Sequence, residues 1–319
     1  MLIYILFIIG FVILIKSADL LVDGAASIAK RLNVSSIVIG LTIVAFGTSL
    51  PELMVNVSAR VRGNPDITIG DILGSNIANI LLVLGISAIV YPITVNKNTT
   101  WKEIPFSLLA VLLLGVMVNS WYIDGSNFIG LTRSSGFIFI SFFIIFLYYV
   151  FGITKSTEDL LVSTDIKEVG LLKSIIFVFL GLVGLVAGGR WIVEGAVKIA
   201  ESCGVSQVLI GLTIVAIGTS LPELATSVVA SYKKQTDIAI GNIIGSNIFN
   251  VFWVLGISAI IHPLPFKISS NADVLMTIFA SLILFAALFV GKKRTIERWQ
   301  GFIMVVIYIG YVTFLVIRG

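Results

Sequence analysis

A nearly identical fifteen-residue motif occurs twice in this chain, and it limits the possible folds more than any other feature. Residues 39–53 read IGLTIVAFGTSLPEL and residues 210–224 read IGLTIVAIGTSLPEL, which agree at fourteen of fifteen positions with a constant offset of 171. Each copy lies in an apolar stretch and carries one glutamate, Glu52 or Glu223. A carboxylate inside a membrane helix is costly and marks function by default. The duplication therefore predicts one paired site built from both copies.

The composition places these motifs in a membrane. Of the 319 residues, 58% are hydrophobic and 12% are charged, against about 25% charged in a soluble domain. The mean hydropathy is +1.09, and apolar runs of about 20 residues recur throughout, as bilayer-spanning helices require. We predict an all-α membrane protein with ten transmembrane helices, at residues 2–26, 38–60, 67–91, 104–119, 136–152, 172–198, 207–231, 238–262, 272–290 and 299–317.

The repeat extends well beyond the opening motif. Residues 66–79 (DITIGDILGSNIAN) match residues 237–250 (DIAIGNIIGSNIFN) at ten of fourteen positions, and VLGISAI occurs at both 83–89 and 254–260. The chain therefore divides into two five-helix halves, 1–152 and 172–319, joined by a polar linker at 153–171. Because five is odd, the second half enters the membrane from the opposite side. Such inverted repeats are a common transporter architecture, with binding at the repeat interface and broken helices at the midplane.

Basic residues are distributed unevenly between the predicted loops. If the N-terminus is outside, thirteen of the 21 lysines and arginines are cytoplasmic, six are external and two lie within spans. The positive-inside rule then favours both termini outside and the linker inside. No basic face interleaved with aromatic residues indicates a nucleic-acid partner. The lone Cys203 and lone His262 argue against a disulfide framework, a metal cluster and a Ser-His-Asp hydrolase.

The motif GTSLPE, at 47–52, predicts a break in its helix near mid-membrane. Pro51 has no N–H, so the carbonyl of Gly47 loses its helical partner and the helix bends. Non-helical backbone at that depth is tolerated only where it faces protein or a water-filled cavity. Carbonyls freed near Ala45, Gly47 and Thr48 then become oxygen ligands beside the side chains of Ser49 and Glu52. The same holds in the second copy for Ala216, Gly218, Thr219, Ser220, Pro222 and Glu223.

The second repeated segment adds a further row of polar side chains. Asp71, Ser75 and Asn79 are spaced four apart, which places them on one helix face. The second half repeats this row as Asn242, Ser246 and Asn250. All of these donors are hard oxygens, a set that suits Ca²⁺, Mg²⁺ or Na⁺ and argues against zinc or copper. Two glutamates neutralise one divalent cation, and a flexible carboxylate pair favours calcium, which accepts about 6–8 oxygen ligands.

These residues resemble the two conserved repeats of the cation/calcium antiporter superfamily, and most closely the prokaryotic sodium/calcium exchangers. The resemblance rests on GTSLPE followed by GSNIAN, then GTSLPE followed by GSNIFN, in repeat regions at about 38–91 and 207–262. It implies a central site formed by the second, third, seventh and eighth helices. The implied calcium ligands are Glu52, Glu223, Thr48 and Thr219. The implied sodium ligands are Ala45, Ser49, Ser75, Asn79, Ala216, Ser220, Ser246 and Asn250, with the shared glutamates.

Two positions depart from this pattern. Some relatives carry an aspartate where this chain has Asn250, so the middle cation site has one potential negative charge fewer and potassium dependence is in doubt. Asp71 stands where the other repeat has Asn242, either as a hydrogen-bonded or protonated helix residue or as an accessory cation contact. In the first and sixth helices Asp19 aligns with Arg190, which leaves open a gate, an ion pair between the halves, or groups that snorkel at helix ends.

The function that these features favour is Na⁺/Ca²⁺ antiport across the cell membrane, with Ca²⁺ exported by alternating access. Shared glutamates make binding of the two ions competitive, and hydroxyls with freed carbonyls suit a weakly charged ion. The alternatives are a H⁺/Ca²⁺ antiporter, an exchanger for another cation and, least consistent with broken inverted repeats, a channel or membrane scaffold. We expect no enzymatic activity and no cofactor, and a monomer whose partners are Ca²⁺, Na⁺ and the lipid bilayer.

Overall fold

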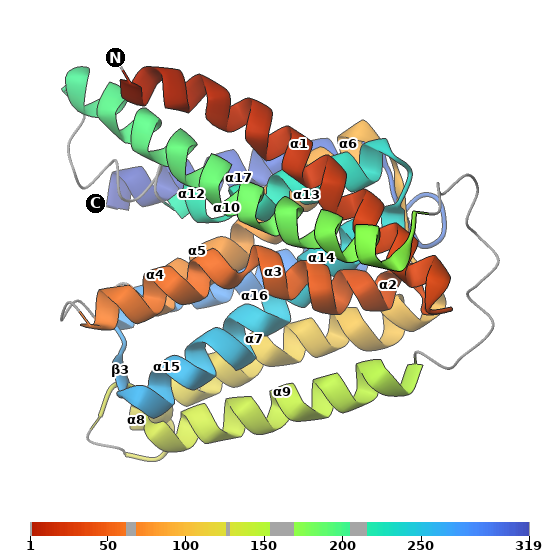
Figure 1. The fold of residues 1–319 in the computed structure, drawn as a ribbon. Coiled ribbons are helices and arrows are strands. Elements are labelled where there is room, and N and C mark those ends of the chain that lie inside the picture. Colours follow the sequence, from red (N-terminus) through yellow and green to blue (C-terminus); the bar gives the residue numbers. More distant parts are fainter. Residues whose placement is uncertain (1, 62–67, 126–127, 154–168, 205–215, 319) are drawn as a thin grey trace.

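The computed structural model describes residues 2–61, 68–125, 128–153, 169–204 and 216–318, which are almost entirely helical (Figure 1). Nine helices in these ranges are long and apolar enough to cross a membrane. The remaining predicted span, the seventh at 207–231, begins outside the described residues, and its described part is helical from Ala216 onward. The predicted multi-pass helical fold is confirmed. Most of the predicted linker lies outside the described residues.

The helices of the first half follow the predicted spans closely. Long helices α1 (Leu2–Arg31) and α9 (Arg133–Ile153) begin and end this half. The second span is divided into α2 (Ser36–Ile39), the π-helical η1 (Gly40–Val44), α3 (Ala45–Thr48) and α4 (Leu50–Val61), and the third into α5 (Thr68–Ala78), the π-helical η3 (Asn79–Val83) and α6 (Leu84–Val90). The fourth combines η4 (Thr99–Glu103) with α7 (Ile104–Val118), and the short α8 (Ser120–Ile123) follows it.

The second half repeats this order. It begins with α10 (Leu171–Ser202) and continues with α12 (Ala216–Thr219) and α13 (Leu221–Tyr232). The eighth span comprises α14 (Thr236–Ile248), the π-helical η7 (Phe249–Leu255) and α15 (Gly256–Ile261). The 3-10 turn η8 (Ile268–Ser270) leads into α16 (Asn271–Ala287), and α17 (Arg298–Arg318) ends the chain. The first and sixth helices are each four to five residues longer at their C-terminal ends than the sequence predicts.

Burial separates central helices from peripheral ones. In the spans Ser36–Asn56, Thr68–Val90 and Thr236–Ile261 between 61% and 83% of the residues are buried, against 28–39% in the other six. The central spans carry the repeated motifs, and α14 packs against η1, α3 and α13 while α5 packs against α12. The polar side chains of the motifs therefore face protein, although Ile43 and Phe46 of the first copy are 36% and 40% exposed, and this lets a polar site lie at membrane depth.

Helices α1 and α10 form a separate pair that crosses the central helices obliquely (Figure 1). Glycines bring their backbones together: a Cβ at Gly10 would lie 3.0 Å from the Gly188 carbonyl oxygen, and a Cβ at Gly188 would lie 2.9 Å from the Gly10 carbonyl oxygen. Small residues at helix crossings are the usual means of close packing in membranes. The pair also contacts the motif helices, since α1 packs on α13 and α10 packs on α12 and α3.

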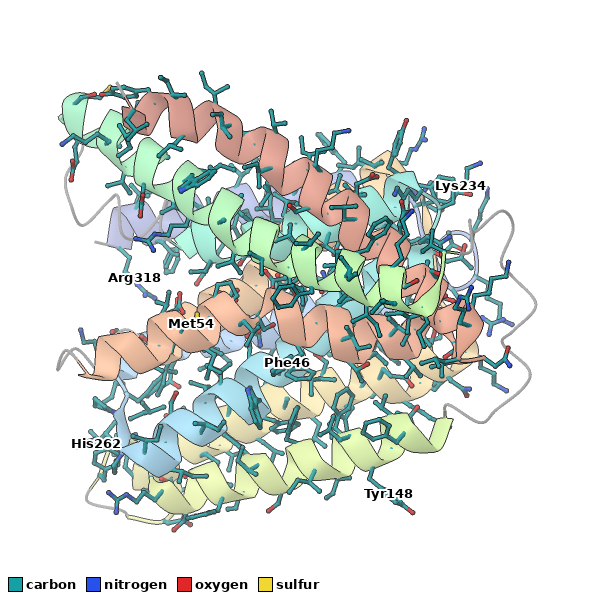
Figure 2. All side chains as sticks on the ribbon, in the orientation of Figure 1. Phe46, Met54, Tyr148, Lys234, His262 and Arg318 are labelled. Atoms are coloured by element: carbon teal, nitrogen blue, oxygen red, sulfur yellow. The ribbon has the colours of Figure 1, made fainter. Side chains whose placement is uncertain are left out.

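The outer surface is apolar, as contact with lipid requires. Large side chains such as Tyr148 and Met54 are 82% and 64% exposed, and Tyr148 projects away from α9 (Figure 2). A soluble monomer rarely exposes so much contiguous apolar surface. Polar groups gather instead at the two ends of the helices, where Lys234 and His262 are labelled at opposite ends of the molecule (Figure 2).

In the described ranges, four two-residue strands accompany the helices and qualify the all-α prediction. Strand β1 (Ile93–Thr94) pairs antiparallel with β4 (Thr295–Ile296), and β2 (Gly130–Leu131) pairs antiparallel with β3 (Leu264–Pro265). Each pair joins a loop of one half to a loop of the other. Sequence reasoning missed them because two-residue strands have no periodicity of their own, and only the packing of the halves brings their backbones together.

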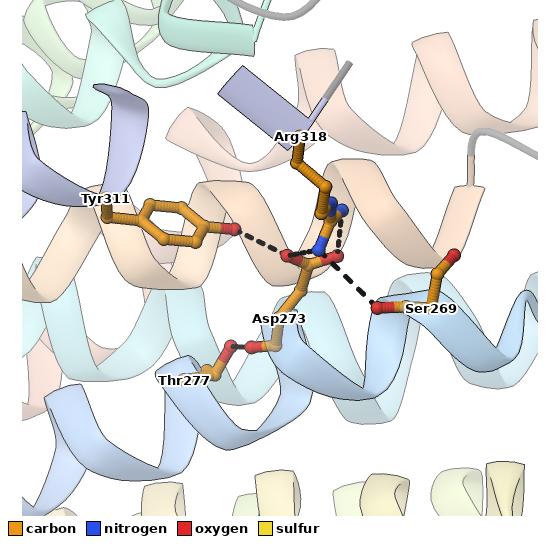
Figure 3. A network of polar contacts seen from close by, with 5 residues as sticks. All are labelled: Ser269, Asp273, Thr277, Tyr311 and Arg318. Carbon is orange, nitrogen blue, oxygen red and sulfur yellow. Dashed lines mark hydrogen bonds and ion pairs between the residues drawn. The ribbon is translucent and has the colours of Figure 1, made fainter. Parts of the chain in front are cut away.

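A buried carboxylate anchors the end of the chain to its neighbour. Asp273, on the first turn of α16, is 6% exposed and accepts hydrogen bonds from both terminal nitrogens of Arg318, at 3.1 and 3.0 Å, and from the Tyr311 hydroxyl at 3.1 Å (Figure 3). Bidentate pairing of arginine with a carboxylate is among the stronger polar contacts in proteins. This network holds the C-terminal turn of α17 against α16.

We expect Arg318→Gln to destabilise the protein by about 1–3 kcal/mol. Removing one partner of a fully buried pair costs roughly 3–5 kcal/mol, and the cost is lower here because 33% of the Arg318 side chain is exposed. Thermal unfolding in detergent measures the change. Arg298→Gln is the matched control, because Arg298 is exposed and only approaches the Val90 carbonyl at 3.4 Å. Equal melting temperatures of the two variants would contradict the anchoring role.

Candidate functional site

Each copy of the fifteen-residue motif interrupts its helix at the same place. Helix α3 ends at Thr48, Ser49 has φ −84° and ψ 1°, and α4 begins at Leu50. In the second copy α12 ends at Thr219, Ser220 has φ −86° and ψ 4°, and α13 begins at Leu221. The two serines differ by 171 positions. Each new helix has a proline at its second residue, where the missing N–H leaves no helical hydrogen bond unmade.

The predicted loss of partners at the Ala45 carbonyl is wrong. The Ser49 N–H donates to the Ala45 carbonyl at 3.0 Å, because the chain stays helical through Thr48 before it breaks. A carbonyl oxygen has two lone pairs, and the Thr48 hydroxyl lies 3.3 Å from the same oxygen. At the corresponding position of the second half the Ser220 N–H donates to Ile217 instead, at 3.1 Å. Ala216 is the first residue of α12.

The breaks bring the two glutamates into the same region at the interface of the halves. Glu52 and Glu223 are both 0% exposed. The Ser49 hydroxyl of the first half lies 3.4 Å from Glu223 Oε1, and the Ser246 hydroxyl lies at the same distance from that oxygen. Across the described residues, no lysine or arginine makes an ion pair with either carboxylate. Two buried carboxylates without a cationic partner require a cation or protons.

The second repeated segment supplies a further set of buried polar side chains. Ser75 and Asn79 on α5 and η3, and Ser246 and Asn250 on α14 and η7, are all at most 1% exposed. Asn79 is the first residue of the π-helical η3, and Asn250 is the second residue of the π-helical η7. Wider turns of this kind shift the side chains that follow and are frequent at functional sites. All four predicted side chains from this segment are therefore buried, and the Ser246 hydroxyl lies 3.4 Å from Glu223 Oε1.

Many oxygens of these residues lack a hydrogen-bond partner, which is unusual for buried polar atoms. Within the described ranges, the buried side-chain oxygens without a partner include Glu52 Oε1, Glu52 Oε2, Glu223 Oε2, Ser75 Oγ, Ser220 Oγ, Asn79 Oδ1 and Asn250 Oδ1. These seven are just over half of the thirteen such oxygens in the described residues, and all seven belong to residues predicted from the sequence as cation ligands. The other six lie on Thr68, Ser87, Glu103, Thr226, Ser231 and Ser258. A buried acceptor costs free energy unless it is satisfied, and a hard cation satisfies several at once.

The two threonines that directly precede the helix breaks, Thr48 and Thr219, have different surroundings. The Thr48 hydroxyl lies 3.0 Å from Asn242 Oδ1, 3.3 Å from the Ser246 hydroxyl and 3.3 Å from the Ala45 carbonyl, so its single hydrogen has three acceptors within reach. Thr219 is 8% exposed and ends α12. Their carbonyls, predicted as calcium ligands, sit directly at the two breaks.

Asp71 and Asn242, the predicted accessory residues, flank the site. Asp71 is half-buried and accepts a hydrogen bond of 2.9 Å from Asn56, which also donates to the Glu52 carbonyl at 2.8 Å. Asn242 is 0% exposed, donates to Ser227 at 2.9 Å and approaches the Glu223 carbonyl at 3.4 Å. Asp71 is therefore a hydrogen-bonded helix residue, and its role as a cation contact stays a prediction.

Sequence reasoning missed several polar residues beside the site. Asn56 and Ser227 follow the two glutamates by one helical turn, and Asn76 and Asn247 lie within the repeated GSN sequence. The repeat itself could have identified them, because Asn56 and Ser227, and likewise Asn76 and Asn247, are 171 positions apart. The site thus rests on two carboxylates within a shell of neutral oxygens, and in the described part of the chain no group of three or more His, Cys, Asp or Glu residues could hold a metal ion.

Comparisons with known proteins found a matching family and similar proteins. Residues 2–152 and 173–317 match the family described as sodium/calcium exchanger protein. The chain is 43% identical over 311 residues to a putative antiporter, CaxA, of Alkalimonas amylolytica, covering 95% of each chain. It is 31% identical to the sodium/calcium exchanger MaX1 of Methanosarcina acetivorans, covering 98% of each. The solved structure of the sodium-calcium exchanger NCX_Mj is similar, with a TM-score of 0.83, 34% identity and 98% coverage of both chains.

If the two carboxylates hold a cation, Glu52→Gln removes cation-dependent stability without harming the cation-free fold. A ligand at 100 times its Kd stabilises a protein by about 2.7 kcal/mol, so Ca²⁺ should raise the melting temperature of the wild-type protein and leave that of the variant nearly unchanged. In sodium-free buffer with a chelator the variant should melt at or above the wild-type temperature.

Glu103→Gln is the matched control for that measurement. Glu103 is equally buried at 1% exposure but accepts a hydrogen bond from Tyr149 instead of facing the site. Its variant should keep the full Ca²⁺-dependent shift. A Ca²⁺-dependent shift of wild-type size in Glu52→Gln would contradict the assignment of the site.

Proposed function

This chain belongs to the sodium/calcium exchanger family of cation/Ca²⁺ antiporters, and we propose that it exchanges Na⁺ for Ca²⁺ and exports Ca²⁺ from the cell. The observation that carries the proposal is the set of buried oxygens without partners around Glu52 and Glu223. We place the protein in the cell membrane with both termini outside, following the distribution of lysines and arginines.

Charge and ligand number favour calcium as one substrate. Two carboxylates balance one divalent cation, and the serine and asparagine oxygens around them bring the possible ligands into the range of about 6–8 that calcium accepts. Magnesium demands a stricter octahedron and keeps more of its water. The same two carboxylates also balance two sodium ions. Because both ions need Glu52 and Glu223, they compete, and competition for shared ligands couples their movements.

The neutral oxygens favour sodium over protons as the counter-ion. Proton exchange needs only the two carboxylates, whereas the unpartnered oxygens of Ser75, Ser220, Asn79 and Asn250 are ligands that a sodium ion can use. Two relatives of known name, MaX1 and NCX_Mj, are sodium/calcium exchangers, which supports the same assignment. H⁺/Ca²⁺ exchange remains the second candidate, because both carboxylates lack a cationic partner in the described structure.

Alternating access requires that α1 and α10 move relative to the motif helices. Lys233, at the end of α13, lies 2.6 Å from Asp19 Oδ1 and 2.6 Å from Asp23 Oδ1 on α1. These contacts join the two halves, although the aligned residue Arg190 pairs with Glu194 at 2.6 Å instead of with Asp19. We infer that the Lys233 pairs hold the cytoplasmic side closed and must separate before that side opens.

Transport in liposomes tests the counter-ion. We expect purified protein to accumulate ⁴⁵Ca²⁺ only when an opposing Na⁺ gradient is present, and Glu52→Gln or Glu223→Gln to reduce that uptake to background. The control is the Glu103→Gln variant, which should transport normally. Uptake of equal rate driven by a pH gradient in sodium-free buffer would replace Na⁺ by H⁺ as the counter-ion.

Removing the lysine tests the closed cytoplasmic side. Each exposed ion pair contributes about 0.2–1 kcal/mol, so Lys233→Gln should increase the open population a few-fold. In a Cys203→Ser background, Ala230→Cys places a thiol on α13 at a position that is 0% exposed and packs in the same apolar cluster as α1. Its rate of reaction with a polar maleimide should rise a few-fold in Lys233→Gln.

The neighbouring lysine supplies the control for this experiment. Lys234 stacks over the Tyr91 ring at 6.0 Å, so Lys234→Gln should leave the labelling rate unchanged. An equal rise in both variants would show that any loss of positive charge at this end has the same effect. In that case the pairs with Asp19 and Asp23 do not hold this side closed.

A further inference from the structure

Two asparagines that no ligand assignment includes connect the halves directly behind the cation site. The Asn79 side-chain nitrogen donates to Asn247 Oδ1 at 3.0 Å, and the Asn250 side-chain nitrogen donates to Asn76 Oδ1 at 3.1 Å. The Asn76 side-chain nitrogen also reaches the Asn247 backbone carbonyl at 3.3 Å. All four residues are at most 2% exposed.

The two hydrogen bonds are related by the internal repeat. Asn76 and Asn247 are 171 positions apart, as are Asn79 and Asn250. Each bond therefore runs from a predicted ligand of one half, Asn79 or Asn250, to an asparagine of the other half that is not a predicted ligand. One bond runs from η3 to α14 and the other from η7 to α5, so the two bonds cross between the halves. A contact made once could be incidental, but a contact made twice in equivalent positions reflects a requirement of both halves.

These bonds determine which end of each site amide faces the cation. A primary amide has a donating nitrogen at one end and an accepting oxygen at the other, and only the oxygen binds a cation. The nitrogens of Asn79 and Asn250 are used by Asn247 and Asn76. Their Oδ1 atoms are buried and have no hydrogen-bond partner in the described parts of the chain. The crossed bonds thus leave both oxygens for the site.

We propose that Asn76 and Asn247 are positioning residues for cation binding: each orients the site asparagine of the opposite half so that its carbonyl oxygen faces the ion. This inference rests on the proposed cation exchange at Glu52 and Glu223. It follows that the ligand geometry of one half depends on a residue of the other, since Asn250 is oriented by Asn76 and not by its own half. Simple packing between helices predicts no such crossed dependence.

The test measures Ca²⁺ and Na⁺ affinity by titration calorimetry on the full-length protein. Asn76→Leu removes the acceptor for Asn250 and leaves the buried amide free to turn. An unsatisfied buried amide should weaken binding of both ions roughly tenfold. Asn76→Asp keeps an acceptor at this position and adds a negative charge behind the site, so its affinity for both ions should not fall below that of wild type. Cation-free melting temperatures and gel filtration verify that both variants fold.

Double-mutant cycles separate positioning from packing, because residues in one hydrogen-bonded network are non-additive. If Asn76 acts through Asn250, Asn76→Leu should have little further effect in an Asn250→Leu background. It should keep its roughly tenfold effect in an Asn79→Leu background, although Asn79 lies on the same helical segment. Equal coupling to both positions, or wild-type affinity of Asn76→Leu, would overturn the proposal.

The Glu52→Gln variant distinguishes the failure of this inference from failure of the proposed function. If Glu52→Gln still binds Ca²⁺ with wild-type affinity, the cation site itself is misplaced, and the asparagine results do not bear on transport. If Glu52→Gln abolishes binding while the crossed coupling is absent, the site stands and the positioning role of Asn76 is wrong.

Discussion

The structure depends on two carboxylates that share a buried site without a positively charged side chain. Taking an ionised carboxylate out of water costs several kcal/mol unless an opposite charge compensates it, and Glu52 and Glu223 are both fully buried. A resident lysine or arginine would satisfy them permanently and leave nothing for a transported ion. Because no ion pair to either glutamate is found among the described residues, a bound cation or protons must balance the two carboxylates.

The inverted duplication supplies what one half alone lacks. Contacts at the site run between halves, from Ser49 to Glu223 and from Thr48 to Asn242. Close approach of the central helices makes these contacts possible: a Cβ at Gly245 would lie 2.6 Å from the Ala45 side chain, so α14 packs directly on α3. Larger residues there would separate the halves and pull the ligands apart.

Sequence alone predicts the membrane class and, in the described residues, the spans to within a few residues; the residues that face a cation stay a prediction, although seven of their buried oxygens lack a partner there. These features can be predicted because long apolar runs, prolines within them and a repeated motif can be recognised in a sequence without knowing how the chain packs. It does not predict the direction of an amide, since asparagine can donate or accept, and the choice for Asn79 and Asn250 depends on residues of the opposite half. The pairing of Lys233 with Asp19 and Asp23, and the two small strand pairs, likewise arise only from tertiary packing.

If the protein alternates between two access states as proposed, the departures from symmetry have a consequence for that cycle. Two identical inverted halves would give the two access states equal free energies, because each state would be the other with the halves exchanged. The charges break this equality. Asp19 and Asp23 bind Lys233 in the structure, but the aligned pair is Arg190 and Glu194, and Lys233 aligns with Arg62. In the exchanged arrangement, α10 would take the place of α1, and Arg62 would take the place of Lys233. Arg190 would then repel the basic residue that Asp19 attracts, so the same double ion pair does not form. The charge pattern therefore favours the state with α1 bound to α13.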